Sequence, residues 1–78
     1  MRHLITVSPA GDAWQVRTPS SEPTLFRSGG QAEACARRLA KRLAGSGGLA
    51  EIEIYLRDGQ LAGRLRFAPA PAHGLAPA

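Results

Sequence analysis

The chain has 78 residues, which allows one domain that buries only about 60% of the surface its unfolded state exposes. Hydrophobic residues make up 44% and charged residues 21%, as in a globular protein and unlike a disordered one. A single cysteine, Cys35, excludes a disulfide-stapled secreted domain, so we expect a cytoplasmic protein. No apolar run approaches the roughly 20 residues of a membrane span or resembles a signal peptide, so no membrane association is expected.

The net charge of +4 at pH 7 favours an acidic partner such as nucleic acid. Codon usage offers a second explanation, because all basic residues except Lys41 are arginine, in a chain rich in Ala, Gly and Pro. A GC-rich coding sequence produces that composition without any role in binding. The charge alone therefore does not decide between the two explanations.

A first β-hairpin is expected near the N-terminus. Residues 3–8 and 13–17 alternate apolar and polar side chains, and the Pro-Ala-Gly-Asp sequence at 9–12 is typical of a turn. A four-residue loop places the apolar pairs on one face of the hairpin, as a buried face requires. The expected pairs are Val7 with Trp14 and Ile5 with Val16.

The segment between this hairpin and the next element predicts a loop. Residues 18–23 contain Ser, Thr and two prolines, which disfavour regular structure. Leu25 and Phe26 follow, and we expect both to pack beneath the first turn of a helix.

A helix is predicted after Ser28, which can act as the N-cap with Gln31 at the capping-box spacing. Residues 32–44 contain neither Gly nor Pro, and glycines at 45, 47 and 48 end the helix. The apolar face is made mostly of small residues, so the helix can approach a sheet closely. That face comprises Ala32, Cys35, Ala36, Leu39 and Leu43, and the opposite arc holds Arg37, Arg38, Lys41 and Arg42.

A second hairpin is expected around Asp58-Gly59, a strong signal for a two-residue turn. Residues 51–57 and 60–67 alternate in character on either side of it. With this turn, apolar residues face apolar or glycine residues and each glutamate faces an arginine, so both kinds of pair agree on one register. The expected pairs are Leu56–Leu61, Ile54–Gly63, Ile52–Leu65, Glu53–Arg64 and Glu51–Arg66.

These elements predict one α+β domain over residues 1–67, a two-layer ββαββ arrangement with both antiparallel hairpins packed on the amphipathic helix. Residues 68–78 are rich in Ala and Pro and cannot bury a core. We expect them to form a disordered tail.

No combination of residues predicts a catalytic, metal or cofactor site. Cys35 lies on the helix face that is expected to be buried, which favours a small hydrophobe over a reactive thiol. His3 and His73 lack the spacing of metal ligands. Glu51 and Glu53 each face an arginine, so ion pairing accounts for them better than acid–base catalysis does. We therefore expect no enzyme activity, no metal and no cofactor.

The glycines outside the turns are also explained without a ligand. Gly29-Gly30 before a helix is compatible with a phosphate-binding loop or with a flexible start of the helix. Phosphate-binding motifs also need a lysine after the glycines or three spaced glycines after a strand, and neither is present, which favours the flexible start. Gly63, opposite Ile54, is expected to make room for the helix backbone.

Four motifs in chain order resemble a small bacterial family catalogued as domain of unknown function 2188. They are Trp14-x-Val16, Phe26 before the helix, Ala32-x-x-x-Ala36 within it, and Asp58-Gly59 in the last hairpin. The resemblance covers roughly residues 4–66. It implies a bacterial ββαββ domain without an assigned activity and assigns no functional residues.

We therefore expect a non-enzymatic binding or interaction module, with a homodimer through an exposed sheet edge as one form of it. The alternative is a nucleic-acid-binding protein whose helix contacts phosphates. An outward basic face is also an ordinary solvated surface, and only Tyr55 is expected to add an aromatic ring outside, so nucleic acid is not favoured. The residues for that contact would be Arg37, Arg38, Lys41 and Arg42.

Overall fold

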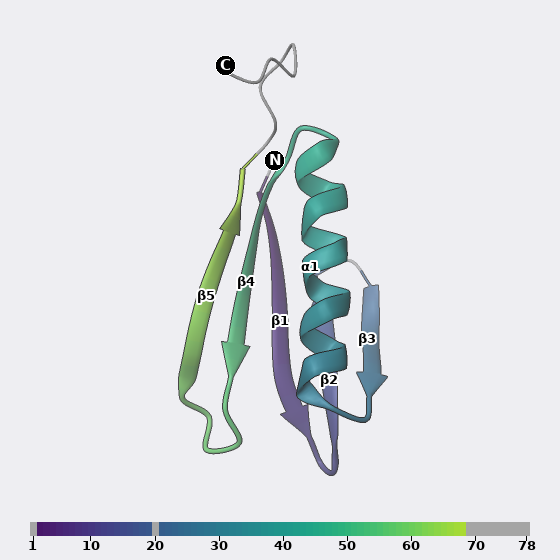
Figure 1. Ribbon diagram of the computed structural model, residues 1–78, viewed down its shortest axis with the longest axis vertical. Helices are drawn as coiled ribbons and strands as arrows, with labels where there is room; N and C mark the ends of the chain where they lie inside the picture. The colour runs from purple at the N-terminus through teal and green to yellow at the C-terminus, as the bar shows by residue number, and fades with distance from the viewer. Residues whose placement is uncertain (1, 20, 69–78) are drawn as a thin grey trace.

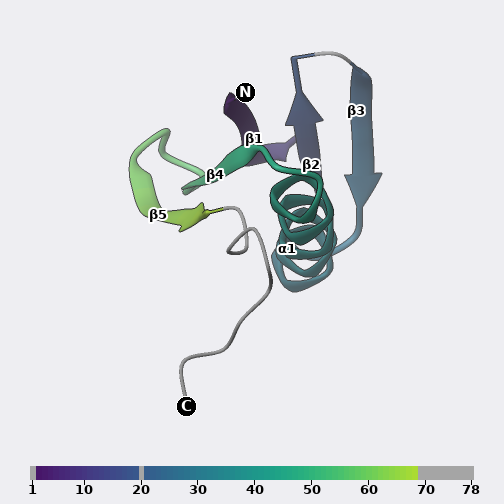
Figure 2. The ribbon, with the colours of Figure 1, turned by 90° about the horizontal axis from the view of Figure 1, so that it is seen from above.

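The computed structural model describes residues 2–19 and 21–68. Within them, five strands form one mixed sheet in the order β3-β2-β1-β4-β5, and one helix packs against a single face of it (Figure 1 and Figure 2). The predicted two-layer α+β fold is confirmed, with one strand more than expected. The elements are β1 (Arg2–Ala10), β2 (Ala13–Thr18), β3 (Ser21–Phe26), α1 (Gly29–Gly45), β4 (Leu49–Tyr55) and β5 (Leu61–Phe67). Apart from Ala68, the tail expected at 68–78 lies outside the described residues.

Parallel pairing of β1 with β4 joins the two hairpins into one sheet, with Ile5 opposite Ile52. Because β1 has a neighbour on both sides and the helix above it, Ile5 and Val7 are fully buried. The core is thin, since the largest fully buried side chains are these two and Ile52.

The first hairpin has a shorter turn than the sequence suggested. Pro9 and Ala10 extend β1, and only Gly11-Asp12 form the turn, with Gly11 at a φ of 62° as the first position of a type II′ turn requires. The predicted pairs Val7–Trp14 and Ile5–Val16 are wrong, because Val7 lies opposite Val16. The shift is by two residues, so the same side chains still face the helix.

The loop predicted at 18–23 is wrong at both ends, because Thr18 is the last residue of β2 and β3 begins at Ser21, where it pairs antiparallel with β2. As an edge strand β3 tolerates Pro23, which cannot donate a ladder hydrogen bond. Phe26 packs against the core as expected. Leu25 does not, since the residue is 63% exposed.

The second hairpin keeps the predicted register along most of its length, from Glu51–Arg66 to Ile54–Gly63. At its tip the two-residue turn and the Leu56–Leu61 pair are wrong. Gly59 N–H donates to the Leu56 carbonyl at 2.9 Å and Leu56 N–H donates to the Gln60 carbonyl at 2.8 Å, which makes a three-residue turn. Leu61 then pairs with Tyr55, and a bulge restores the register. The residue left over in the bulge is Ala62.

The helix has the predicted N-cap, because Ser28 Oγ accepts a hydrogen bond from Gln31 N–H at 3.1 Å. At the other end Gly47 adopts a φ of 100° and donates to the Ala44 carbonyl at 3.0 Å. The buried face is a row of alanines at every fourth position, flanked by half-buried larger residues. The row is Ala32, Ala36, Ala40 and Ala44, and Cys35, Leu39 and Leu43 lie beside it.

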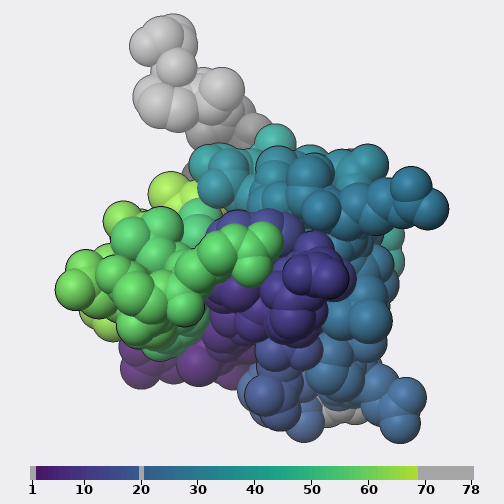
Figure 3. All heavy atoms as spheres, turned by 90° about the horizontal axis from the view of Figure 1, so that it is seen from below, coloured from purple at the N-terminus to yellow at the C-terminus, as the bar shows by residue number. Residues whose placement is uncertain are grey.

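The tips of the two hairpins are tied together by Arg57, which precedes the second turn. Its Nη1 donates to the Gly11 carbonyl at 3.1 Å, and its guanidinium carbon lies 5.6 Å from the centre of the Trp14 ring. Figure 3, which faces this end of the molecule, shows the green tip of the second hairpin against the purple tip of the first.

Candidate interaction surfaces

The four basic residues singled out from the sequence lie on the side of α1 that faces away from the sheet, and all are exposed. Arg37 Nη2 lies 3.5 Å from a carboxylate oxygen of Glu33, one helical turn earlier. In the part of the chain that the structure describes, no acidic side chain pairs with Arg38, Lys41 or Arg42. We call these four residues, Arg37, Arg38, Lys41 and Arg42, the basic arc.

A shallow hollow of about 310 Å³ adjoins the basic arc, between the first half of α1 and the end of β3. Phe26 contributes an aromatic ring and Arg38 a guanidinium, with Gln31 and Ala34 completing the lining. Proteins that bind single-stranded nucleic acid combine an aromatic side chain, on which a base stacks, with a nearby cation that contacts the phosphate.

On the sheet face opposite the helix, Glu51 is only 6% exposed and is held by two arginines. Arg66 donates to Glu51 Oε2 through Nη2 at 3.0 Å and Nε at 3.2 Å, and Arg2 donates to Oε1 at 3.3 Å. The hydrogen bond from Arg66 lowers the pKa of Glu51, and Arg2 lowers it further, while burial acts in the opposite direction. The predicted partner Arg66 is confirmed, and Arg2 is a partner that sequence reasoning missed.

Glu53, two residues further along β4 than Glu51, also accepts hydrogen bonds from neighbouring side chains. Arg64 Nη2 lies 3.1 Å from Glu53 Oε2, and Tyr55 Oη donates to Glu53 Oε1 at 2.9 Å. That hydrogen bond is the main cause of a raised pKa for Tyr55, with burial adding to it. The two glutamates therefore stabilise the outer face of β4 and β5 through ion pairs.

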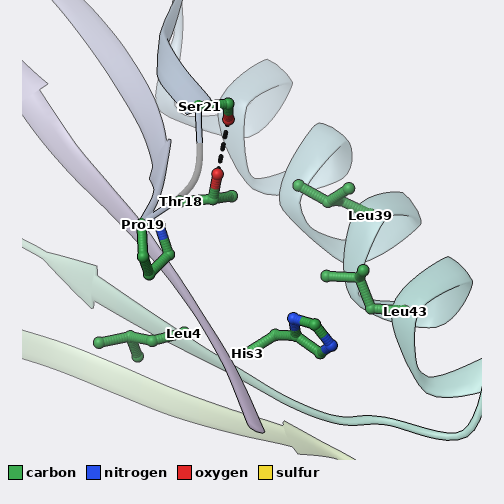
Figure 4. Close-up of a pocket in the computed structure, with 7 residues that line it drawn as sticks. All are labelled: His3, Leu4, Thr18, Pro19, Ser21, Leu39 and Leu43. Carbon is green, nitrogen blue, oxygen red and sulfur yellow. Dashed lines mark hydrogen bonds between the residues drawn. The ribbon is translucent and has the colours of Figure 1, made fainter. Parts of the chain in front are cut away.

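A hollow of about 220 Å³ lies between the start of β1, the β2–β3 connection and the second half of α1 (Figure 4). The ring of His3 points towards Leu39 and Leu43 of the helix, while Leu4 points to the other side of β1. The hydroxyls of Thr18 and Ser21 are hydrogen-bonded to each other at 2.6 Å. A catalytic hydroxyl needs a base within hydrogen-bond distance to activate it. Thr18 and Ser21 are instead hydrogen-bonded to each other, so neither has the arrangement of an activated nucleophile. The lining consists of His3, Leu4, Thr18, Pro19, Ser21, Leu39 and Leu43.

Cys35 is a free, half-buried thiol packed against the core. Among residues 2–19 and 21–68, no group of three or more His, Cys, Asp or Glu side chains could hold a metal ion. His73 falls outside those residues.

The free edges of the sheet are β3 and β5, and they differ in chemistry. Pro23 interrupts the row of donors on β3, whereas β5 contains no proline. The helix lies mainly over β1, β4 and β2, which leaves β5 at the margin of the sheet (Figure 2). On the helix side of that margin, Ile54, Leu65 and Phe67 are therefore only half-buried.

Comparisons with protein-family models, curated proteins and solved structures found no match. The resemblance to domain of unknown function 2188 accordingly stays a prediction from the four motifs. Within the described ranges, α1 is too short and too polar to cross a membrane.

Two surfaces thus remain as candidates for binding. One is the basic arc with the adjoining hollow, and the other is the free edge of β5 with its half-exposed apolar side chains. The basic arc was recognised from helical periodicity, whereas the β5 edge depends on strand order, which no local pattern in the sequence reveals.

Proposed function

We propose that the protein is a small, non-enzymatic, cytoplasmic binding module that takes up an extended protein segment at the free edge of β5. The observation that carries the proposal is the edge itself. Residues 63–67 pair regularly with β4 on one side and contain no proline, and on the other side they face no strand of the chain as described, residues 2–19 and 21–68. An unpaired strand edge is a template for the addition of another strand.

The side chains of β5 suggest what such a segment would look like. Successive side chains of a strand point to opposite faces, so Leu65 and Phe67 both lie on the helix side. Main-chain hydrogen bonds would supply affinity that is independent of sequence, and these two half-buried apolar groups would select apolar residues at alternating positions of the partner.

The test is selection of peptides from a random heptapeptide phage library on the immobilised full chain. We expect enrichment of peptides with alternating apolar residues that bind the wild type and bind Leu65→Lys at least about tenfold more weakly. Leu25→Lys is the matched control, since Leu25 is an exposed leucine on the opposite edge strand. Failure to enrich any peptide, or equal binding to both variants, would contradict the proposal.

Nucleic-acid binding through the basic arc is the second candidate, favoured by the position of Phe26 beside Arg38 in the hollow. Binding of a labelled single-stranded oligonucleotide, followed by fluorescence anisotropy, should weaken with salt. Arg37 is paired with Glu33, which leaves three cations, Arg38, Lys41 and Arg42, to contact phosphates. Three such contacts give a slope of log K against log salt of about −2 to −3. Arg38→Gln should make that slope less negative by about one. Arg64→Gln, which removes an arginine paired with Glu53, should leave the slope unchanged. Absence of binding at low salt would remove this candidate.

A further inference from the structure

We infer that the strand added at the β5 edge is β5 of a second copy of this chain, antiparallel to the first and related to it by a two-fold axis at Leu65. The inference rests on the proposed use of this edge for strand addition. It names the partner and the register, and it makes the sheets of the two copies continuous.

Gly63 is the first observation, because neither a positive φ nor a close contact with the described residues of its own copy requires a glycine there. Positive φ angles occur at Gly11, Gly47 and Gly59 among the described residues, so Gly63 has a backbone conformation open to any residue. A Cβ atom added to Gly63 would meet no atom of residues 2–19 and 21–68 within 4 Å. The expectation that this glycine makes room for the helix backbone is therefore wrong, and the space above it is open.

The shape of β5 is the second observation, because it fixes where a two-fold axis can lie. The bulge at Ala62 ends the regular part of the strand, which runs from Gly63 to Phe67 and has Leu65 at its centre. In an antiparallel pair centred on Leu65, each Gly63 lies opposite Phe67 of the other copy. An aromatic ring that covers a glycine across a strand pair stabilises that glycine, and the symmetry forms this contact twice.

On the outer face the same register places Arg64 opposite Arg66 of the second copy. Like charges in this position would ordinarily oppose pairing. Each arginine already has a carboxylate on its own β4, with Arg64 at 3.1 Å from Glu53 and Arg66 at 3.0 Å from Glu51. The row across the interface thus runs from Glu53 to Arg64, and then to Arg66 and Glu51 of the second copy. These four side chains have no net charge among them, and Arg2 adds a cation at Glu51.

A second copy suits this edge better than an unrelated segment for two reasons. An isologous contact needs only one self-complementary patch, and β5 supplies both the open glycine and the ring that fills it. The domain is also small and its core is thin, and association is a common way for such domains to gain buried apolar area.

Charged substitutions at Leu65 test both the partner and the register. The wild type should be a dimer by sedimentation equilibrium, and Leu65→Lys and Leu65→Glu should each associate at least about tenfold more weakly, because like charges then meet at the axis. Mixing the two variants should restore the dimer, since Lys then faces Glu. Leu25→Lys, on β3, should dimerise like the wild type. Circular dichroism of each variant checks that it is folded.

Cross-linking supplies an independent reading that does not depend on stability. Directly opposite residues in an antiparallel pair have Cα atoms about 4.5 to 5.5 Å apart, which a disulfide can span. In a Cys35→Ala background, Leu65→Cys should therefore form a covalent dimer on oxidation. Leu61→Cys, also on β5 but away from the axis, should not do so at the same rate.

The outcomes separate the inference from the proposed function. A wild-type chain that is monomeric at about 1 mM overturns the inference, while the peptide selection still decides whether the β5 edge binds other proteins. A dimer that persists in both charged variants and does not cross-link through Leu65→Cys also overturns it, because the contact then lies elsewhere. A dimer that is lost in both variants, returns on mixing and cross-links at residue 65 supports it.

Discussion

The indole ring of Trp14 occupies the space that a side chain at Gly29 would need. A Cβ atom on Gly29 would lie 3.2 Å from Cε2 and 3.3 Å from Cζ2 of that ring. Trp14 belongs to β2 and Gly29 begins α1, so this close approach seats the start of the helix on the first hairpin. The glycine pair that resembled a flexible helix entry thus includes one position with a steric role.

Gly29→Ala and Gly30→Ala should therefore have opposite effects. At Gly30 the nearest atom to an added Cβ is Ser28 Oγ at 4.0 Å, so alanine should raise the free energy of unfolding by about 0.5 to 1 kcal/mol through the entropy of the unfolded chain. At Gly29 the Trp14 ring must shift against Arg57, and we expect a net loss of about 1 kcal/mol. Urea unfolding and the emission maximum of the single tryptophan measure both effects. Equal stabilisation by the two substitutions would contradict this account.

Arg57→Ala should loosen the contact between the hairpin tips. It removes the hydrogen bond to the Gly11 carbonyl and the cation above Trp14, together worth about 0.5 to 1 kcal/mol at an exposed site. For a domain of this size, the Tm should fall by roughly 4 °C. The emission of Trp14 should shift as well, since its ring loses a neighbour. Arg27→Ala, at an exposed position before the helix, is the control, and an equal fall in Tm there would contradict a specific role for Arg57.

The sequence predicted those parts of the fold that depend on residues close together in the chain. The capping of α1 by Ser28 and the Glu51–Arg66 register involve residues close in sequence, and both are confirmed. The strand β3 was missed because it is an exposed edge strand in which only Phe26 is partly buried, so it has no alternation of apolar residues. The tip registers were missed because Pro9 continues β1 and Asp58-Gly59 fits two turn lengths.

The candidate surfaces divide in the same way. The basic arc follows from helical periodicity alone, so its position could be predicted. The β5 edge could not, because it becomes an edge only when β1 pairs with β4, and parallel pairs between distant segments leave no local pattern. Arg2 was missed as a partner of Glu51 for this reason, since the two lie 49 residues apart in sequence.

The alanine row of α1 predicts a sharp difference between two neighbouring alanines. Ala36 is fully buried against the sheet, and Ala34 is exposed on the other side of the helix. Ala36→Leu should lower the free energy of unfolding by about 1 to 3 kcal/mol, because the added carbons force the helix away from the sheet. Ala34→Leu is the matched control and should change stability by no more than about 0.5 kcal/mol. Urea unfolding distinguishes them, and similar values would show that α1 does not pack closely through this row.

Glu51 should make stability depend on acidity. Arg66 and Arg2 lower the pKa of its carboxyl below the ordinary value of 4.5 that it regains on unfolding. A carboxyl with a lowered pKa in the folded state contributes stability that is present above the unfolded value and is lost as the pH falls through the folded one. The wild type should therefore lose stability below about pH 4.5, because protonation of the Glu51 carboxylate removes its ion pairs with both arginines.

Glu51→Gln removes this contribution at every pH. The variant should be less stable than the wild type at neutral pH, where Arg2 and Arg66 lose their counter-ion, and the difference between the two should shrink as the pH falls below about 4.5. Thermal unfolding at a series of pH values measures that difference. Glu22→Gln, at an exposed position on β3, controls for the loss of one negative charge. A difference between wild type and Glu51→Gln that stays constant down to about pH 2.5 would mean that the ionised form of Glu51 does not stabilise the sheet.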